Sequence, residues 1–481
     1  MSESIARLEQ RIAEEQQTFA RPLRSLLKRS AITCPGELTL EQAAGIMRRE
    51  EVGSLVVVDA QSRPIGVVTT HDIVQAVALG ASARAVAEVM TRSPVSLPGH
   101  ALAYEAAVAM LAQRIRHVLV VEDGRLVGVV SERDLFSLQR LGFGELAMEI
   151  RLAADLGTLA RLAAEVRGLT RLLVEQGVGA EQLTMFVSVL NDRVSQRTLE
   201  IVRKRHDLER ISWCWLAFGS EGRFEQTFST DQDNGLIFAA HGDSAAGARE
   251  RLLPFAREVN QALDACGYPL CRGNVMASNP ELCLSVDEWK AKMARWIEVS
   301  MPKALLDAAV CFDFRGLQGD GSLAATLRAW VAERVRANPR FLRHLAEAAL
   351  QAQPALGRFG SFDDDGGSID LKLRGSRIFV DAARVYALSR ALQLTNTAER
   401  LRAAAPGLGM DAAAVEAIIG GFFFIQRLRL RGQAAPAKPL PPAANRVDLQ
   451  QINEFERRIL KEALRQARRL QQRLALDYEL G

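Results

Sequence analysis

The sequence predicts an α+β protein built from several domains. A segment of helices and short apolar strands occurs twice near the N-terminus, and a strand, a Gly-Ser turn and a second strand with two aspartates follow in the middle of the chain. Long stretches rich in Ala, Leu, Arg and Glu show helical spacing. A chain of 481 residues is also too long for one ordinary hydrophobic core.

Composition excludes several classes of protein. The hydrophobic content of 48% and the charged content of 25% are typical of a globular protein rather than a disordered one. The net charge of +4 comes from arginines spread along the chain, without the clustered basic face that binds nucleic acid. We therefore expect no nucleic-acid partner.

The cysteines and the N-terminal segment indicate the compartment. None of the six cysteines forms a Cys-x-x-Cys pair, and the loose group Cys266, Cys271 and Cys283 lacks the spacing of a zinc site, so reduced thiols are expected. Residues 1–21 are charged and helical in pattern, without the apolar core of a signal peptide, and no run approaches the length of a membrane span. We predict an N-terminal helix at 1–21 and a cytoplasmic protein that does not contact the membrane.

Residues 31–76 and 94–138 are copies of one another. Each copy predicts a helix, an apolar strand, a tight turn, a second apolar strand and a further helix. The matched pairs are Pro35 with Pro98, Val57 with Val120, Gly66 with Gly128, and Asp72 with Asp134. The offset falls from 63 to 62 (98 − 35, then 134 − 72), so the turn of the second copy has lost one residue. Because such short copies cannot each bury a core alone, we expect them to pack face to face.

The duplicated segment resembles a CBS pair, the adenosine-ligand sensing module, over residues 22–141. In that family a hydroxyl and an aspartate after the second strand contact phosphate and ribose. The resemblance therefore implies binding of an adenine nucleotide by four residues, Thr69, Asp72, Ser131 and Asp134. Hydroxyls near a helix start suit phosphate, because the free N–H groups and the helix dipole favour an anion there. The alternative is that both aspartates only cap helices.

Residues 142–207 lack strand alternation and carry apolar residues at helical spacing, for example Leu152, Leu156, Leu159 and Leu162. We predict a helical connector between the duplicated segment and the motif that follows. It either couples the two functionally or acts as a rigid spacer.

The motif at residues 216–238, LAFGSEGRFEQ followed by TDQDNGLIF, carries the chemistry. Because strand side chains repeat every second residue, Asp231 and Asp233 are expected on one face, where they can hold one Mg²⁺ or Mn²⁺ ion. Gly219 allows a phosphate to approach the backbone, and Ser220 offers a hydroxyl. Arg223 is expected to meet phosphate or to anchor one of the aspartates, with Glu225 holding it in place.

This motif resembles the polymerase-beta-like nucleotidyltransferase superfamily, and more closely the putative nucleotidyltransferases fused to CBS pairs, which are relatives of the PII-protein uridylyltransferases and glutamine-synthetase adenylyltransferases. The resemblance implies a transferase domain with a mixed sheet at residues 208–320. It also implies a third catalytic carboxylate, for which Asp313 is the best candidate and Asp287 and Glu281 are alternatives. Asp313 could instead pair with Arg315 or a neighbouring helix.

Residues 321–481 are predicted to be helical and to match the helical substrate-binding domain of the same family. Lys372, Arg374, Arg377 or Arg384 could close over the triphosphate or the acceptor, or they could be ordinary helix-surface residues. After a proline-rich linker, a long helix reaches about Leu476. Its predicted apolar stripe is Ile452, Phe455, Ile459, Ala463, Ala467, Leu470 and Leu474. A homodimer is expected through the CBS pair or through this helix.

Together these features predict a Mg²⁺-dependent nucleotidyltransferase that moves a nucleoside monophosphate from a nucleoside triphosphate to an acceptor, with a protein as the favoured acceptor. Adenine nucleotides at the CBS pair would regulate it. The alternative is a nucleotide-sensing signal-transduction protein whose transferase domain no longer reacts. The sequence does not identify the preferred base, the acceptor or the sign of regulation.

Overall fold

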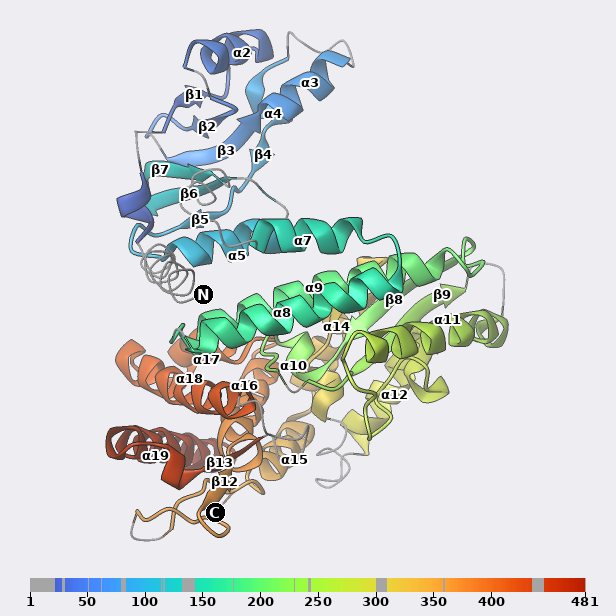
Figure 1. The fold of residues 1–481 in the computed structure, drawn as a ribbon, viewed down its shortest axis with the longest axis vertical. Coiled ribbons are helices and arrows are strands. Elements are labelled where there is room, and N and C mark those ends of the chain that lie inside the picture. Colours follow the sequence, from blue (N-terminus) through green and yellow to red (C-terminus); the bar gives the residue numbers. More distant parts are fainter. Residues whose placement is uncertain are drawn as a thin grey trace, which may run out of the picture. The chain divides into compact units, whose positions relative to one another are not determined.

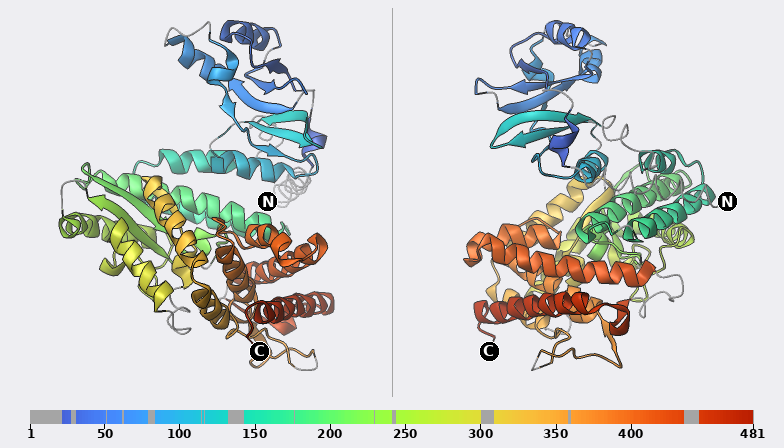
Figure 2. Two further views of the ribbon diagram at one scale, coloured as in Figure 1. Left: turned by 180° about the vertical axis from the view of Figure 1, so that it is seen from behind. Right: turned by 60° about the vertical axis from the view of Figure 1, so that its left-hand side comes forward.

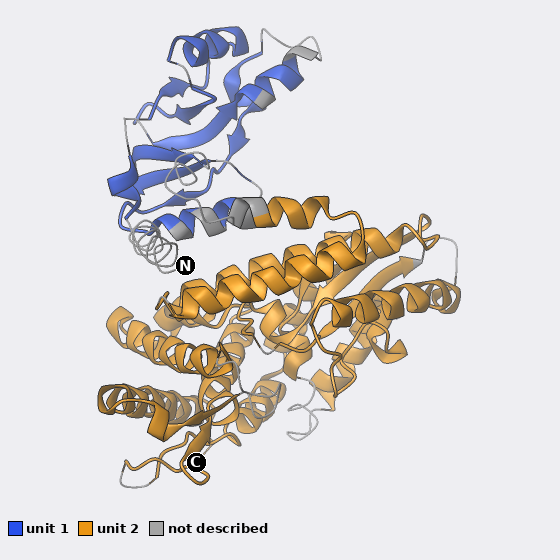
Figure 3. Cartoon of the chain, in the orientation of Figure 1, with its two compact units in different colours: residues 1–145 blue, residues 146–481 orange. Residues whose placement is uncertain are grey.

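The computed structural model describes residues 22–27, 31–50, 52–61, 63–78, 84–113, 115, 117–131, 143–175, 177–228, 230–240, 244–299, 309–357, 360–434 and 445–480. The predicted N-terminal helix at 1–21 lies outside these residues. The chain forms two compact units, residues 1–145 and residues 146–481 (Figure 3). The predicted connector after residue 145 therefore belongs to the same unit as the transferase motif.

The first unit contains the two repeats (Figure 1). The first repeat consists of β1 (Thr33–Pro35), α2 (Leu40–Arg49), β2 (Ser54–Val58), β3 (Pro64–Thr69) and α3 (Thr70–Ala78). The described part of the second repeat consists of β5 (Ser96–Leu97), α5 (Ala103–Gln113), β6 (His117–Glu122) and β7 (Arg125–Ser131). The short strands β1 and β5 were not expected from the sequence; each runs parallel to the central strand of its repeat.

The two hairpins of the first unit show why the second repeat is one residue shorter than the first. In both repeats the pairing shifts at the same place, after Val57 in β2 and after Val120 in β6. The second hairpin is closed by Asp123 and Gly124, both with positive φ, as a tight two-residue turn requires. The first hairpin uses a longer turn, stabilised by Asp59, whose carboxylate accepts from the backbone N–H groups of Gln61 and Arg63.

Each repeat has its own hydrophobic cluster, but neither repeat completes that cluster alone. Val86 and Met90, from the segment between the repeats that includes α4 (Val86–Val89), complete the first cluster. Leu23 and Leu26, from the turn η1 (Leu23–Leu26), complete the second. Each repeat thus has a cluster of its own, to which a flanking segment adds apolar surface. The face-to-face packing of the two repeats stays a prediction. A further short strand, β4 (Thr91–Arg92), joins the first sheet beside β3.

The second unit is built around one mixed sheet in the order β10-β9-β8-β11. Its strands are β8 (Ile211–Ala217), β9 (Asn234–Ala240), β10 (Cys283–Ser285) and β11 (Arg315–Gly319). Strand β8 is antiparallel to both of its neighbours, and β10 is parallel to β9. The apolar strand before the Gly-Ser turn, β8, lies inside the sheet, and Trp215 and Leu216 are buried.

Helices surround this sheet (Figures 1 and 2). Preceding it in the chain are α7 (Phe143–Leu152), α8 (Leu156–Glu175) and α9 (Ala180–Arg203), of which α8 and α9 pack together and α9 also packs on α11 (Ala245–Ala265) and β11. After β10 come α12 (Val286–Glu298), α14 (Gly321–Arg336) and α15 (Pro339–Ala349). The predicted connector thus contributes a largely buried helix, α9, to the transferase fold.

The C-terminal region is helical, as predicted. It contains the π-helical turn η4 (Lys372–Ser376), then α16 (Arg377–Ser389), α17 (Thr397–Leu408), α18 (Ala412–Ala434) and α19 (Glu454–Asp477), with the small ladder β12 (Ser368–Asp370) and β13 (Arg446–Asp448). Helix α19 docks on α18 and α16. The prediction that Phe455 belongs to the buried apolar stripe is wrong. Its side chain is 71% exposed, while Glu456 and Leu460 are buried.

Among the described helices, none combines the length and the hydropathy needed to cross a bilayer.

Candidate functional site

The Gly-Ser turn begins where β8 ends. Residues 219–222 form one short helical turn, α10 (Gly219–Gly222), and the N–H of Phe218 donates to the backbone oxygen of Asp233 at 2.9 Å. Gly219 has φ +56°, and a Cβ atom there would lie 2.8 Å from Val310 and 3.1 Å from Asp233 Oδ2. The turn therefore requires glycine, both for its backbone conformation and for the space beside Asp233.

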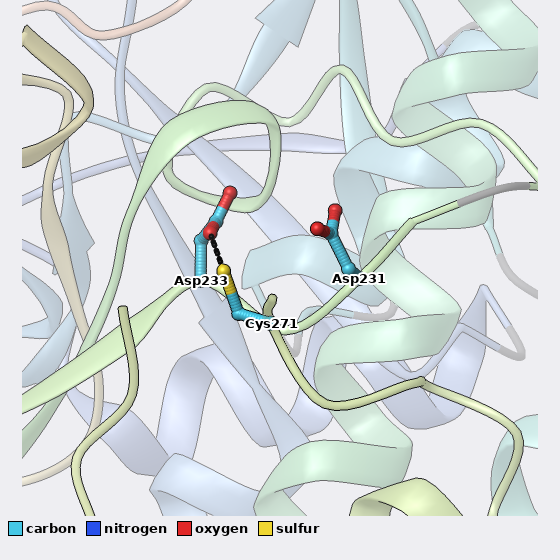
Figure 4. A group of neighbouring side chains, drawn as sticks. All are labelled: Asp231, Asp233 and Cys271. Carbon is cyan, nitrogen blue, oxygen red and sulfur yellow. Dashed lines mark hydrogen bonds between the residues drawn. The ribbon is translucent and has the colours of Figure 1, made fainter. Parts of the chain in front are cut away.

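Asp231, Asp233 and Cys271 meet beside this turn (Figure 4). One ligand atom from each of the three lies within 4.8 Å of the other two, and all three residues are partly buried. The aspartates lie in the segment just before β9, and Cys271 lies in the loop after α11. The cysteine thiol donates to Asp233 Oδ1 at 3.4 Å. The structure thus brings the two predicted acids together and adds a thiol that sequence analysis missed.

The electrostatics of this cluster favour a cation. Burial, together with the charge of Asp231, raises the pKa of Asp233 to about 6, and burial next to Asp233 raises the pKa of the Cys271 thiol to about 11. Within the described part of the chain, neither aspartate has an ion pair with a lysine or arginine. Two adjacent carboxylates that form no ion pair with a described lysine or arginine fit a divalent ion that prefers oxygen, such as Mg²⁺.

A buried amide network holds the segment that carries the two acids. The Gln232 side chain donates to the backbone oxygens of Asn260 and Tyr268, and the Asn260 side chain donates to Asn234 Oδ1 at 3.0 Å. The Asn234 side chain also accepts from the backbone N–H of Ala277 at 2.8 Å. The alternation Asp-Gln-Asp-Asn could have indicated this, because residues that alternate along an extended segment point to opposite sides.

Arg223 and Glu225 do not contact the two acids. Arg223 donates to Glu225 Oε2 and to Asp313 Oδ2, both at 2.7 Å. Glu225 in turn accepts from the backbone N–H of Thr397 at 2.6 Å, at the start of α17. A carboxylate at a helix N-terminus is stabilised by the free N–H groups and the helix dipole. The predicted pairing of Arg223 with Asp231 or Asp233 is absent here, because its guanidinium group is committed to Glu225 and Asp313.

Asp313 is fully buried at the centre of an arginine cluster. Its Oδ1 accepts from Arg400 at 2.6 Å and from Arg384 at 3.0 Å, and its Oδ2 accepts from Arg384 at 2.6 Å and from Arg223. Burial alone would raise the pKa of Asp313, but the charges of Arg384, Arg400 and Arg223 hold it far below its usual range.

The structure therefore differs from the expectation that Asp313 is the third carboxylate of the metal site. Asp313 is not part of the group that could hold a metal ion among the described residues, and both of its oxygens are occupied by guanidinium groups. The alternative that Asp313 pairs with a neighbouring helix agrees with the geometry, since Arg384 lies on α16 and Arg400 on α17. Arg315 pairs with Asp192 instead, at 2.6 Å. Of the other candidates, Glu281 pairs with Lys292, and Asp287 lies in the first turn of α12.

Some of the other residues predicted to bind phosphate have an ion pair within the protein, and others have none. Ser220 is partly buried, and its hydroxyl makes no hydrogen bond to any described residue. Arg374 pairs with Asp363, and Arg377 pairs with Asp381. Lys372 has no ion pair among the described residues, is exposed, and lowers the pKa of Asp233 against the effect of burial. Lys372 is therefore the basic residue of this group that remains available to an anion.

Glu221, inside the turn, is a buried acid that sequence analysis did not single out. It is 8% exposed. Burial, together with the nearby charge of Asp192, raises its pKa to about 8. The raised pKa favours the protonated form of Glu221 near neutral pH, which limits the negative charge beside the motif.

In the first unit, Thr69 and Asp72 bond to one another at the start of α3. Asp72 Oδ2 accepts two hydrogen bonds from Thr69, one from the hydroxyl at 2.7 Å and one from the backbone N–H at 2.8 Å. This is the helix-capping role that was considered as the alternative to ligand binding. Ser131 ends β7, and Asp134 lies outside the described residues.

Comparison with family models matches three parts of the chain. Residues 23–79 and 86–140 match the CBS domain, residues 164–303 match the putative nucleotidyltransferase DUF294, and residues 339–478 match the putative nucleotidyltransferase substrate binding domain. The resemblance stated from the sequence is confirmed. The transferase match begins at residue 164, inside the predicted connector, in agreement with the packing of α8 and α9 in the second unit.

Curated relatives match smaller parts. An uncharacterised 17.7 kDa protein of Acidianus ambivalens is 32% identical over 119 residues, which are 24% of this chain and 73% of that protein. The CBS domain-containing protein CBSCBSPB1 of Arabidopsis thaliana is 26% identical over 185 residues, 38% of this chain and 32% of that protein. The L-aspartate semialdehyde sulfurtransferase of Methanocaldococcus jannaschii is 27% identical over 117 residues, 24% of this chain and 23% of that protein.

Solved structures also match part of the chain. The CBS domain protein PAE2072 from Pyrobaculum aerophilum, complexed with AMP, is 32% identical, with a TM-score of 0.25; the match covers 27% of this chain and 99% of that one. The CBS domain pair of protein MJ0100, in complex with 5-methylthioadenosine and S-adenosyl-L-methionine, is 27% identical, with a TM-score of 0.24; the match covers 25% of this chain and 95% of that one.

The arginine cluster predicts a large effect of Asp313→Asn on stability. The substitution keeps the shape of the side chain but leaves three buried guanidinium groups without their shared anion, so the free energy of unfolding should fall by about 3–5 kcal/mol. Urea unfolding followed by tryptophan fluorescence measures it. All five tryptophans, at positions 213, 215, 289, 296 and 330, lie in the second unit, so the signal reports that unit alone.

Glu416→Gln is the matched control for this measurement, because it breaks the exposed ion pair with Arg402. It should change the free energy of unfolding by at most about 1 kcal/mol. If Asp313→Asn unfolds at the same urea concentration as the wild type, the cluster does not stabilise the second unit.

Glu221→Gln should stabilise the second unit increasingly as pH rises. In the unfolded chain Glu221 ionises near its ordinary pKa of about 4.3, whereas in the folded protein it keeps its proton up to a pH of about 8. Between these values the folded state binds more protons, so wild-type stability declines with rising pH by at most about 1.4 kcal/mol per pH unit from this group. Glutamine mimics the protonated form and removes that decline.

The measurement is the difference in free energy of unfolding between Glu221→Gln and the wild type at a series of pH values between about 4.5 and 8. Contributions shared by both proteins cancel in the difference. A difference that stays constant over this range would contradict the elevated pKa of Glu221.

Proposed function

Because the chain belongs to the family in which a CBS pair is joined to a putative nucleotidyltransferase domain and its substrate-binding domain, we propose that it is a Mg²⁺-dependent nucleotidyltransferase. It would move a nucleoside monophosphate from a nucleoside triphosphate to an acceptor, with Mn²⁺ as an alternative ion. The observation that carries this proposal is the pair Asp231 and Asp233, which lie together beside the Gly-Ser turn and form no ion pair with a described lysine or arginine.

The reaction exchanges one phosphate bond for another. An acceptor oxygen forms a bond to the α-phosphorus, the bond from that phosphorus to the β-phosphate oxygen breaks, pyrophosphate leaves, and the acceptor proton passes to solvent. Asp231 and Asp233 would hold a Mg²⁺ ion, which would neutralise charge on the phosphate oxygens. Such transfers depend mostly on positioning and electrostatic stabilisation, so the residues that orient the donor matter more than a single nucleophile.

The residues of this chain divide into those that touch the donor and those that position them. Gly219 keeps the turn beside Asp233 free of a side chain that would collide with Val310 and Asp233, and the Ser220 hydroxyl is available as a donor. Lys372, whose charge lowers the pKa of Asp233, offers a positive charge as a partner for the triphosphate. Arg223 and Glu225 act as positioning residues, because their side chains tie the turn to α17 and to Asp313.

We favour a protein acceptor of the kind modified by uridylyl- or adenylyltransferases, in keeping with the resemblance of the motif. The second candidate is a nucleotide-binding regulator without transferase activity. The commitment of Asp313 to three arginines favours this candidate, because the third acid of the superfamily is then not next to the other two. The retained pair of acids and the obligatory Gly219 favour the enzyme.

We further propose that an adenine nucleotide bound to the CBS pair regulates the transferase. The Thr69 hydroxyl and the Asp72 carboxylate lie together at the start of α3, and Asp72 Oδ1 is free of hydrogen bonds to described residues. A ribose hydroxyl could donate to that oxygen while the capping bonds persist. Regulation requires that the nucleotide bind the active and the inactive state with different affinities.

The transferase proposal predicts that the double variant Asp231→Asn/Asp233→Asn loses at least about 100-fold in rate, because the charge that holds the divalent ion is gone. Purified protein is incubated with Mg²⁺ or Mn²⁺ and each α-labelled nucleoside triphosphate, alone and with cell extract. Labelled protein and released pyrophosphate are measured.

Asp264→Asn is the control, since Asp264 is an exposed acid at the end of α11 without an ion pair among the described residues. It should keep the wild-type rate. Equal label transfer by the double variant and the wild type with every triphosphate would exclude the enzyme. Absence of transfer by the wild type, with nucleotide binding retained, would select the regulator.

The sensor proposal predicts that AMP, ADP or ATP binds the full chain with measurable heat and that Asp72→Asn weakens this binding by roughly tenfold, the value of one charge-assisted hydrogen bond of about 1.5 kcal/mol. Isothermal titration calorimetry of the wild type, Asp72→Asn and Asp231→Asn/Asp233→Asn separates the two nucleotide sites. Heat that persists in the Asp231→Asn/Asp233→Asn variant and falls in Asp72→Asn supports the sensor. No heat with any adenine ligand removes it.

A further inference from the structure

Cys271 gives the acidic cluster a ligand that Mg²⁺ chemistry does not need. Mg²⁺ binds oxygen and keeps water in several of its positions, whereas a thiolate selects softer ions such as Zn²⁺. Cys271 is also the one cysteine of the six that is not buried. Cys266 and Cys283, its neighbours in sequence, are buried, and neither belongs to the group of possible metal ligands among the described residues.

The loop that carries Cys271 is fixed to the same framework as the two acids. The backbone oxygen of Cys271 accepts from Asn274 N at 3.0 Å, which closes a tight turn. The next residue, Val275, accepts through its backbone oxygen from Asn234 N at 3.0 Å. Asn234 directly follows Asp233, so the thiol and the carboxylate are held by one continuous set of backbone bonds. Their proximity is built into the fold rather than left to a surface side chain.

The spacing suits a tetrahedral ion. With zinc bonds of about 2.3 Å to sulfur and about 2.1 Å to oxygen, the edge between the two ligands of a tetrahedron is about 3.6 Å. The distance between Cys271 Sγ and Asp233 Oδ1 is 3.4 Å. The second carboxylate, from Asp231, also lies within reach of both, and neither acid has a lysine or arginine partner in the described chain. Three ligands from two loops leave a fourth position open.

We propose that Asp231, Asp233 and Cys271 form a site for a zinc-class divalent ion, which binds through two carboxylates and the Cys271 thiolate and thereby excludes Mg²⁺. The thiol proton passes to solvent when the sulfur–metal bond forms. Binding stands on the geometry alone. Its consequence, reversible inhibition of nucleotidyl transfer by zinc, rests on the proposed function.

The first test uses Co²⁺, a spectroscopic substitute for Zn²⁺, added to the full chain under reducing conditions. A cobalt–thiolate bond gives an ultraviolet charge-transfer band, and tetrahedral geometry gives intense visible bands. We expect both bands to saturate at one ion per chain and to disappear when Zn²⁺ is added. Cobalt binding without the charge-transfer band would overturn the proposal.

The second test compares Cys271→Ser with Cys266→Ala, a buried control in the same region. Loss of a residue that merely supports a metal ligand costs roughly 10–100-fold in metal affinity, so loss of the ligand itself should weaken Zn²⁺ binding at least about tenfold. The Kd for Mg²⁺ should change by no more than about twofold, and Cys266→Ala should leave both values as in the wild type. Equal Zn²⁺ affinity in Cys271→Ser and the wild type would overturn the proposal.

Two readouts keep this result interpretable. Tryptophan fluorescence confirms that the second unit of each variant is folded, and in the wild type Zn²⁺ should protect Cys271 from alkylation by iodoacetamide. Unchanged alkylation of Cys271 at saturating Zn²⁺ would also overturn the site. If zinc binds through Cys271 but no triphosphate is consumed, the metal site stands and the proposed function fails. If nucleotidyl transfer occurs and Cys271→Ser binds Zn²⁺ as tightly as the wild type, the proposed function stands and the zinc site fails.

Discussion

The second unit depends on one buried ion cluster, in which the Asp313 carboxylate accepts hydrogen bonds from Arg223, Arg384 and Arg400. A buried charge is costly unless it is paired and fully hydrogen-bonded, and removal of one partner leaves the others uncompensated. The three arginines come from the Gly-Ser turn, from α16 and from α17. The cluster therefore forces the turn of the sheet and two helices of the C-terminal region to adopt one arrangement or to leave charges buried without partners.

This constraint has a direct effect on the candidate site. Glu225 follows Arg223 by two residues and accepts from the N-terminus of α17, so the helical region is bonded to the motif at two points. Residues 372–376 lead directly into α16, whose Arg384 is part of the cluster. The position of Lys372 relative to Asp233 is thus set by buried ion pairs rather than by the exposed lysine itself. Because the helical region is anchored in this way, Lys372 is already positioned for an anionic ligand at Asp231 and Asp233 before that ligand binds.

What the sequence could predict follows the range of the interactions. The repeats could be predicted from matched residues, β8 from a run of apolar residues, and the pair Asp231 and Asp233 from their spacing of two residues. The partners of Asp313 lie 71 to 90 residues away in the chain, and Cys271 lies 38 residues from Asp233, so no local pattern reveals them. Phe455 fitted a helical stripe, but the stripe's exact phase depends on which face α18 and α16 cover, which is a tertiary property.

The contrast between the two groups of acids indicates where a ligand binds. The chain surrounds Asp313 with three arginines and gives Glu225 both an arginine and a helix N-terminus, so these carboxylates are neutralised by the protein itself. Asp231 and Asp233 lie close together, burial and the charge of Asp231 raise the pKa of Asp233, and neither acid has an ion pair among the described residues. A fold with abundant arginine could have supplied one here. Lys372 lowers the pKa of Asp233 without forming an ion pair with it, and we propose that a divalent ion supplies the remaining positive charge, because two carboxylates at this spacing suit such an ion.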